Sequence, residues 1–348
     1  MCKDENLSSS SSNISGCLDF GDEKFSIGCW EKKEFVSRDG DTKLAANVFF
    51  ASIDQRNEKA AGESACTALV AVIAEWLHRN PNRMPIRAEF DSLIREGSAQ
   101  WRRLCEMDTY QSRFPDGHFD LDTVLEAQVR PLKVARERSF VGFFQPEGVE
   151  EDVCDFLKGA MMFDDIWDAI IEETAPKESC EPVVYIVSWN DHFFILKVDP
   201  DAYYIIDTLG ERLHEGCDQA YIIRFDREAT LSHVPKEKSK DECKHDEAGF
   251  SQSNTCSSSS TDSLLSRKSP SEGGEYRVEE QRERDGDKSD IDENACEGKE
   301  ACKCFLKEFF AAVPLRELQV DIKKGLLGKL PLHQRLQIEF HFMSLDSP

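Results

Sequence analysis

The segment at residues 66–78 constrains the fold of this 348-residue chain more than any other. It reads CTALVAVIAEWLH, with apolar side chains at helical spacing on nearly every side, and Pro81 and Pro85 follow it. A helix that is apolar nearly all round is buried on more than one side. The segment therefore predicts a core helix that ends before the prolines.

Helical patterns come first along the chain, and strand patterns follow. Further helices are predicted at 90–105, 123–127 and 152–173, after a strand or its lead-in at 44–53. Short segments rich in β-branched and aromatic residues predict strands at 183–188, 192–198, 203–207 and 220–225. This order predicts an α+β fold in which the buried helix packs on an antiparallel sheet.

Two low-complexity segments lie outside the expected core. Residues 1–24 form a polar, serine-rich tail, and residues 236–300 are rich in serine and charge with almost no aromatic residues. Neither can offset its ordering entropy by burial, so both are expected to be disordered. We therefore expect one domain made of residues 25–235 and 301–345, the second part a helix and a strand, with a disordered insertion between them.

The charge of the chain narrows the classes of partner. Lys and Arg number 43 and Asp and Glu number 67, which gives a net charge of −24. Nucleic acid and anionic lipid both attract the opposite sign, so neither is an expected partner. No stretch approaches the roughly 20 apolar residues that span a bilayer, and the N-terminus lacks the order of a secretory signal. We expect a cytoplasmic or nuclear protein, with no direct membrane insertion, whose partner or substrate is another protein.

The 13 cysteines are scattered and include no CxxC pair. The spacing therefore predicts no structural zinc site, and no cofactor is expected. His78, His118 and His214 lack partners at metal-ligand spacing and are read as surface or loop residues, as are His333 and His341. In a reducing compartment the thiols should be mostly free.

Cys66 differs from the other cysteines because it falls in the first turn of the buried helix. Gly62 supplies a flexible backbone before it, and Ser64 is a candidate cap for the helix. The N-terminus of a helix favours negative charge, so a thiol there is biased toward thiolate. The alternative is a small buried residue that starts a core helix.

His192 and Asp207 are the candidate partners of Cys66. The tetrad DPDA at 199–202 predicts a hairpin between the strands at 192–198 and 203–207. With an even loop, paired residue numbers sum to 401, which places Asp207 diagonal to His192 on one face. An odd loop would put the two on opposite faces. A thiol, a histidine and an acid in this order match a nucleophile, its base and the group that orients the base.

The order of these residues resembles the papain-like cysteine peptidase superfamily, which includes deubiquitinases. The segments FFASIDQRNEKAAGESACTALVAVIAEWL, FPDGHFDLDTV, VVYIVSWNDHFFILKVD and LPLHQRLQIEFHF are similar to the C-terminal region of plant proteins of unknown function that carry an NT-type C2 domain. The resemblance covers about residues 30–230 and 301–343 and implies a papain-like fold without an established activity. The C2 domain is expected to be absent, because only about 25 residues precede the similar segment.

The sequence departs from active papain-like enzymes at the oxyanion hole. Such enzymes usually hold the oxyanion with a Gln or Asn about five to seven residues before the nucleophile. Those positions are Lys59, Ala60 and Ala61 here, while Gln55 and Asn57 are within reach only if the loop folds back.

Two functions follow from these observations. The leading prediction is an inactive or weakly active papain-like domain that serves as a protein-interaction scaffold. The alternative is a thiol peptidase, possibly similar to a deubiquitinase, with a triad of Cys66, His192 and Asp207.

Overall fold

A computed structural model of the chain describes residues 26–60, 62–145, 157–173, 183–235, 295–324 and 332–346. The predicted tail at 1–24 and residues 236–294 of the predicted insertion lie outside these ranges.

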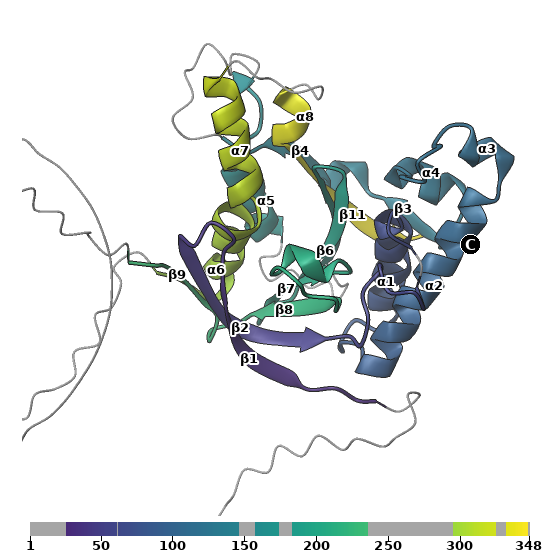
Figure 1. Ribbon diagram of the computed structural model, residues 1–348, viewed down its shortest axis with the longest axis horizontal. Coiled ribbons are helices and arrows are strands. Elements are labelled where there is room, and N and C mark those ends of the chain that lie inside the picture. Colours follow the sequence, from purple (N-terminus) through teal and green to yellow (C-terminus); the bar gives the residue numbers. More distant parts are fainter. Residues whose placement is uncertain are drawn as a thin grey trace, which may run out of the picture. The chain divides into compact units, whose positions relative to one another are not determined.

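The described residues form an 11-stranded sheet (Figure 1). Its main path runs in the order β10-β9-β2-β8-β7-β6-β5-β11-β3, while β1 pairs with β2 and β4 pairs with β11. In this part of the chain the named strands pair antiparallel. The strands are β1 Trp30–Val36, β2 Thr42–Phe50, β3 Leu132–Val134, β4 Phe140–Phe143, β5 Val183–Trp189, β6 His192–Val198, β7 Tyr203–Asp207, β8 Tyr221–Phe225, β9 Thr230–His233, β10 Cys296–Glu297 and β11 Gln337–Leu345.

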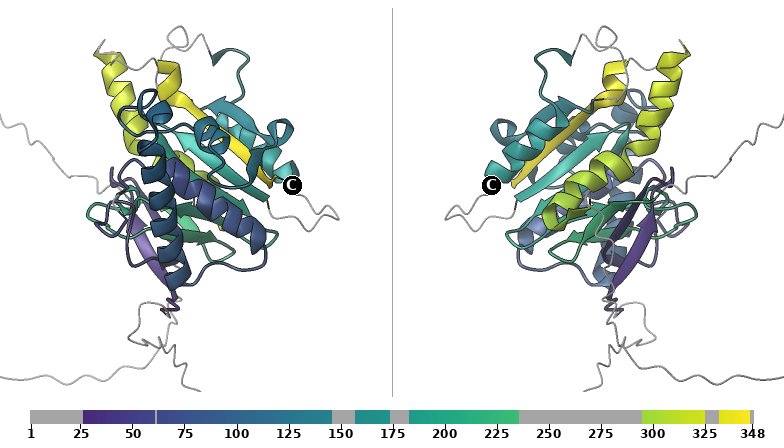
Figure 2. Two further views of the ribbon diagram at one scale, coloured as in Figure 1. Left: turned by 90° about the vertical axis from the view of Figure 1, so that its right-hand side faces the viewer. Right: turned by 90° about the vertical axis from the view of Figure 1, so that its left-hand side faces the viewer.

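Helices cover both faces of the sheet, as the two views of Figure 2 show. On one face α1 packs on β5 and β6, and α2 packs on α1. On the other face lie α6, a π-helical segment and α7. The helices are α1 Cys66–Arg79, α2 Arg87–Cys105, α3 Asp108–Gln111, α4 Leu121–Glu126, α5 Phe163–Glu173, α6 Gly298–Cys304, the π-helical η5 Phe305–Phe310, α7 Ala312–Lys323 and α8 Leu332–Leu336, with short 3-10 turns η2 Arg136–Arg138 and η4 Gly210–Arg212. The mixture of helices with an antiparallel sheet confirms the predicted α+β class.

Alternation along β6 divides the core into two apolar clusters. Ile195 points to the cluster that holds α1, whereas Phe194 and Leu196 point to the cluster that holds α6 and η5. Because both faces are covered, the central strands are apolar on both sides and read as continuous apolar runs. His192 is the first residue of this central strand, so the packing on both faces of β6 holds its backbone in place.

The core helix α1 agrees with its prediction. Ten of its residues are buried, and it begins at Cys66. Gly97 of α2 lies so close to Leu69 of α1 that a Cβ on Gly97 would be 2.8 Å from the Leu69 Cα. The helix is therefore buried between the sheet and α2, as its apolar circumference requires.

Several predicted boundaries were wrong. The helix predicted at 152–173 is observed only as α5, with residues 152–156 outside the described ranges. The charged segment of β1 gave no strand pattern, yet it pairs with β2 along its length. The C-terminal part is not one helix and one strand, because α6, η5, α7 and α8 precede β11.

The predicted insertion also ends earlier than residue 300. Cys296 pairs with Leu231 of β9 to form β10, and α6 begins at Gly298. Gly298 has a φ of +61°, a left-handed conformation that glycine adopts without strain and that turns the chain from β10 into α6. Two short elements therefore fold where composition predicted disorder.

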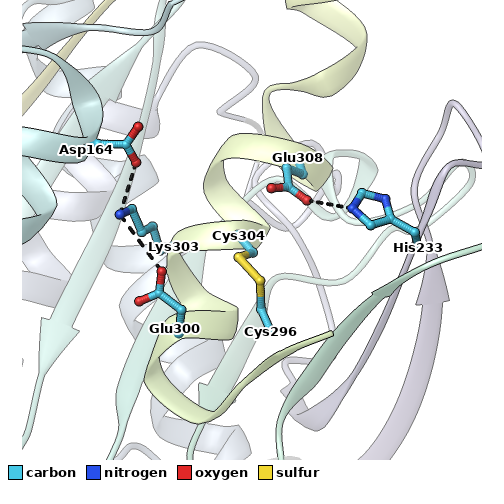
Figure 3. Close-up of a disulfide and its surroundings, with 7 residues drawn as sticks. All are labelled: Asp164, His233, Cys296, Glu300, Lys303, Cys304 and Glu308. Atoms are coloured by element: carbon cyan, nitrogen blue, oxygen red, sulfur yellow. Dashed lines mark ion pairs between the residues drawn. A yellow bond between two sulfur atoms is a disulfide. The ribbon is translucent and has the colours of Figure 1, made fainter. Parts of the chain in front are cut away.

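A disulfide joins Cys296 to Cys304 (Figure 3). The turn at the start of α6 brings the two Cα atoms to 6.7 Å, within the usual range for a disulfide. The expectation that the thiols are free was therefore wrong for this pair, because sequence spacing did not reveal the turn. Beside it Lys303 lies 3.0 Å from Asp164 of α5, which ties α6 to α5.

Candidate active site

Cys66 is the first residue of α1 and is 5% exposed. The N-cap is Ala65 rather than the predicted Ser64, and no side chain caps this helix. Ser64 instead places its Oγ 2.9 Å from His118 Nε2. The first amide groups of a helix have no partners within the helix and carry partial positive charge, so the position favours a thiolate.

His192 begins β6 directly after a two-residue turn. Asn190 and Asp191 have φ values of +52° and +59°, and Trp189 pairs with His192 across the turn. Two positive φ values are the requirement of a tight type I′ hairpin, and Asn and Asp tolerate them better than most residues. The turn therefore fixes His192 at the end of the sheet, where it is 6% exposed.

Asp207 ends the neighbouring strand β7 and is fully buried. Val198 pairs with Tyr203, so paired numbers sum to 401 and the predicted register is confirmed. Asp207 Oδ2 and Oδ1 lie 2.9 and 3.0 Å from His192 Nε2. The predicted diagonal pair is therefore in direct hydrogen-bond contact.

Two further donors hold the Asp207 carboxylate. The backbone N–H of Leu209 donates to Oδ1 at 2.9 Å, and the Tyr221 hydroxyl donates to Oδ2 at 3.4 Å. A buried carboxylate with several donors is fixed in orientation, and it fixes the His192 ring in turn. Because Nε2 faces Asp207, Nδ1 is the ring nitrogen left for the thiol.

The protonation of the three groups is coupled. Burial alone would lower the pKa of His192, but the charge of Asp207 and hydrogen bonds with Asp207 and Cys66 raise it to about 9. Burial alone would raise the pKa of Cys66, but the hydrogen bond with His192 and the charge of that ring lower it. The backbone N–H of Phe193 and the hydroxyl of Thr67 act in the same direction. Both shifts favour a thiolate beside an imidazolium.

Cys66 and His192 line a cavity of about 430 Å³. Asp207 is outside this lining and contacts His192 from the buried side. Ser188, Phe193 and Glu339 contribute to the cavity from the sheet, and Glu339 pairs directly with Ser188. Further lining comes from Thr67 of α1, from Trp189 and Gln337 of the sheet, from the turn at 190–191, from the loop at 114–120 and from residues 333–335 of α8.

Two histidines that were read as surface or loop residues also line this cavity. His118 is exposed but reaches the cavity from the loop before α4, and His333 reaches it from α8. Both are exposed, as expected of surface residues. Their place in the cavity was not predicted, because nothing in the sequence indicates that these segments fold against the start of α1. Only knowledge of which distant segments are in contact would have predicted that His118 and His333 line the cavity.

The loop before α1 does fold back, but its amides have other partners. Gly62 N–H donates to the carbonyl of Gln55, and Gln55 Nε2 donates to the carbonyl of Glu63 at 2.6 Å. Gln55 Oε1 accepts from the Thr208 hydroxyl at 2.8 Å. Gln55 and Asn57 are both absent from the residues that line the cavity.

Metal-binding clusters and membrane-spanning helices are both absent from the described residues. Across the part of the chain that the structure describes, His, Cys, Asp and Glu side chains form no group that could hold a metal ion. Over the same residues, every helix is too short or too polar to cross a membrane.

Comparison with protein families decides the affiliation of the chain. A family model described as a domain of unknown function, DUF8490, matches residues 32–343. The chain belongs to this family. The match includes Cys66, His192 and Asp207, so the whole candidate site lies inside the DUF8490 domain.

Other comparisons add little to this affiliation. Among curated proteins, none matches the DUF8490 chain. A solved structure that it resembles is the ubiquitin-specific protease encoded by murine cytomegalovirus tegument protein M48, in complex with a ubiquitin-based suicide substrate. The two share 14% identity with a TM-score of 0.33, over 55% of this chain and 88% of the viral chain. This likeness is too low to establish a shared fold.

Proposed function

We propose that the DUF8490 domain of this chain is a papain-like thiol hydrolase that acts on a protein or peptide. Cys66 is the nucleophile, His192 the general base and acid, and Asp207 the group that orients the ring. The observation that carries the proposal is the buried His192–Asp207 contact at 2.9 Å, with His192 lining the same cavity as Cys66 at the start of α1. A cysteine that only packs in the core would not require a paired His192 and Asp207 beside it.

The chemistry follows from the protonation of the pair. The Cys66 thiolate attacks the carbonyl carbon of the substrate, and the carbonyl oxygen gains negative charge. The imidazolium of His192 then gives its proton to the leaving group as the bond to that group breaks, which leaves a thioester on Cys66. Neutral His192 takes a proton from water, and the resulting hydroxide hydrolyses the thioester. Asp207 holds Nε2 throughout and stabilises the charged ring.

The cavity fits an extended chain segment as substrate. It runs between the start of α1 and the β5–β11 face, and it is bordered by exposed turn residues rather than enclosed. We therefore propose a peptide substrate whose scissile bond lies at Cys66. The narrower prediction, an enzyme similar to deubiquitinases, rests on the resemblance of the sequence alone, as does the relation to plant proteins with an NT-type C2 domain.

The scaffold function is the second candidate, and the partners of Gln55 favour it. The side-chain amide of Gln55 donates to the backbone carbonyl of Glu63 and so is not available to an oxyanion. Loss of one oxyanion donor lowers the rate by a factor on the order of 10²–10³. A domain with a formed pair and no oxyanion donor would bind a partner in its cleft without turnover.

Active-site labelling separates the two candidates. The purified chain is treated with a ubiquitin C-terminal electrophile and with a small peptide electrophile, and the adducts are located by mass spectrometry. We expect an adduct at Cys66 that disappears in Cys66→Ala. Cys217→Ala is the matched control, because Cys217 is also buried and its pKa is raised by burial. Absence of an adduct at Cys66 with both reagents would leave the scaffold function.

A further inference from the structure

The loop at 114–120 makes hydrogen bonds to residues on both sides of Cys66. Ser64, two residues before it, contacts His118 with 2.9 Å between Oγ and Nε2. Thr67, the next residue after it, donates from its hydroxyl to the carbonyl of Phe119 at 2.6 Å. The backbone N–H of His118 is itself fixed by Asp116 Oδ1 at 3.1 Å. Residues 118–119 therefore lie alongside the nucleophile and are held there.

His118 shares the cavity with Cys66 but comes from a different element than His192. His192 comes from the sheet, whereas His118 comes from the loop bound to the start of α1. The Ser64 hydroxyl rotates freely and can donate to Nε2 of a neutral ring. In that tautomer the second ring nitrogen, Nδ1, carries a proton and is a donor. Of the three histidines that line the cavity, His192 is therefore suited to proton transfer and His118 to hydrogen-bond donation.

Neither side chain that the sequence offers as an oxyanion donor reaches the cavity. Gln55 and Asn57 are outside the cavity lining, and the Gln55 amide donates to Glu63. We propose that His118 is a further catalytic residue of this site, which donates a hydrogen bond from Nδ1 to the substrate carbonyl oxygen when Cys66 attacks. This inference rests on the proposed thiol hydrolase function.

His118 transfers no proton when Cys66 attacks the carbonyl carbon. The bond from Cys66 Sγ to the carbonyl carbon forms, and the electron pair of the carbonyl double bond moves to oxygen. His118 keeps its proton and shares it with that oxygen by a hydrogen bond. When the double bond forms again, the bond to the leaving group breaks, and the leaving group takes the electron pair.

Two reactions of the same thiol test the inference. Acylation of Cys66 by p-nitrophenyl acetate passes through an oxyanion, and the burst of p-nitrophenolate reports its rate. Alkylation by iodoacetamide displaces iodide at a saturated carbon and forms no oxyanion. We expect His118→Ala to slow the acylation by on the order of 10²–10³ and to leave the alkylation of Cys66 within about twofold. His118→Gln keeps a donor and should recover part of the acylation rate.

Controls separate this role from a structural one. His214→Ala removes an exposed histidine that stacks on Phe35 outside the cavity, and it should change neither reaction. The thermal midpoint of each variant and the iodoacetamide rate, measured by mass spectrometry on the Cys66 peptide, report whether the site still forms.

Each outcome decides the inference. Equal loss of both reactions in His118→Ala and His118→Gln, or undiminished acylation in both, would overturn it. A loss of acylation in Gln55→Ala with none in His118→Ala would assign the donor to Gln55 instead. If the wild-type chain gives no burst that depends on Cys66, the proposed function fails and the inference falls with it.

Discussion

Replacement of Asp207 by Asn should remove a pH-dependent part of the stability of the domain. The experiment uses the Cys66→Ala background, so that the thiol does not titrate together with the ring. The pKa of His192 is about 9 in the folded protein against 6.5 for an ordinary histidine, chiefly because the charge and hydrogen bond of Asp207 outweigh burial. Because this folded-state pKa is raised, the stabilisation is fully present below pH 6.5 and is lost as the pH rises through 9.

The size of the effect follows from these pKa values. The pKa of His192 rises from 6.5 to about 9 on folding. Each pKa unit is worth about 1.36 kcal/mol, so the stabilisation is on the order of 3 kcal/mol. Removal of the thiol takes away one of the smaller contributions, so the value is an upper bound. Between pH 6 and pH 9, Cys66→Ala should therefore lose roughly 2–3 kcal/mol more than Cys66→Ala/Asp207→Asn does.

Urea unfolding at four pH values between 6 and 9 measures this difference. Subtraction of the two curves cancels the groups that titrate alike in both variants, and Cys66→Ala/His192→Gln is the second reference. Parallel curves for Cys66→Ala and Cys66→Ala/Asp207→Asn would refute the reasoning, since they would mean that His192 gains no proton affinity from Asp207.

Four other changes test the fold around the site. Gly97→Ala should cost about 1–3 kcal/mol in urea unfolding, because its Cβ would meet α1 backbone at 2.8 Å, whereas an effect near zero would mean that the helices are further apart. Asp191→Val should cost about 1–2 kcal/mol and lower the thermal midpoint, while Asp191→Gly should not, because the φ of this residue is +59°. Dithiothreitol should destabilise the wild type by roughly 2–3 kcal/mol in urea but not Cys296→Ser, because the disulfide closes a loop with a sequence separation of 8. Replacement of residues 236–294 by a short Gly/Ser linker should leave the thermal midpoint nearly unchanged, and a large drop would place that segment in the folded core.

The parts of the site that follow from local rules could be predicted from the sequence. The apolar circumference of 66–78 predicted a buried helix, and its start placed Cys66 in the first turn. An even DPDA loop was predicted to put Asp207 on the side of His192, and the observed register and contact agree. These inferences needed only helix periodicity, strand alternation and turn chemistry.

The remaining features depend on contacts between distant segments. His118 reaches the cavity because Thr67 and Ser64 bind its loop, and no periodicity relates residues that are more than 50 positions apart. The pairing of Cys296 with Cys304 required the turn at Gly298, in a region whose composition resembles a disordered segment. Composition is an average over a long segment, so it did not reveal the two-residue strand β10 near the end of the predicted insertion.

The central claim is that His192 activates Cys66, and the rate of Cys66 alkylation at pH 6.5 tests it most directly. An ordinary thiol with a pKa near 8.5 is about 1% thiolate at this pH, so a thiolate held by an imidazolium should react up to about a hundredfold faster. Iodoacetamide followed by peptide mass spectrometry gives the rate for each cysteine in the wild type and in His192→Ala. The account predicts that Cys66 reacts ahead of Cys217 and Cys105 in the wild type and slows sharply in His192→Ala. It is contradicted if Cys66 is among the slowest thiols of the folded protein and its rate is the same in His192→Ala.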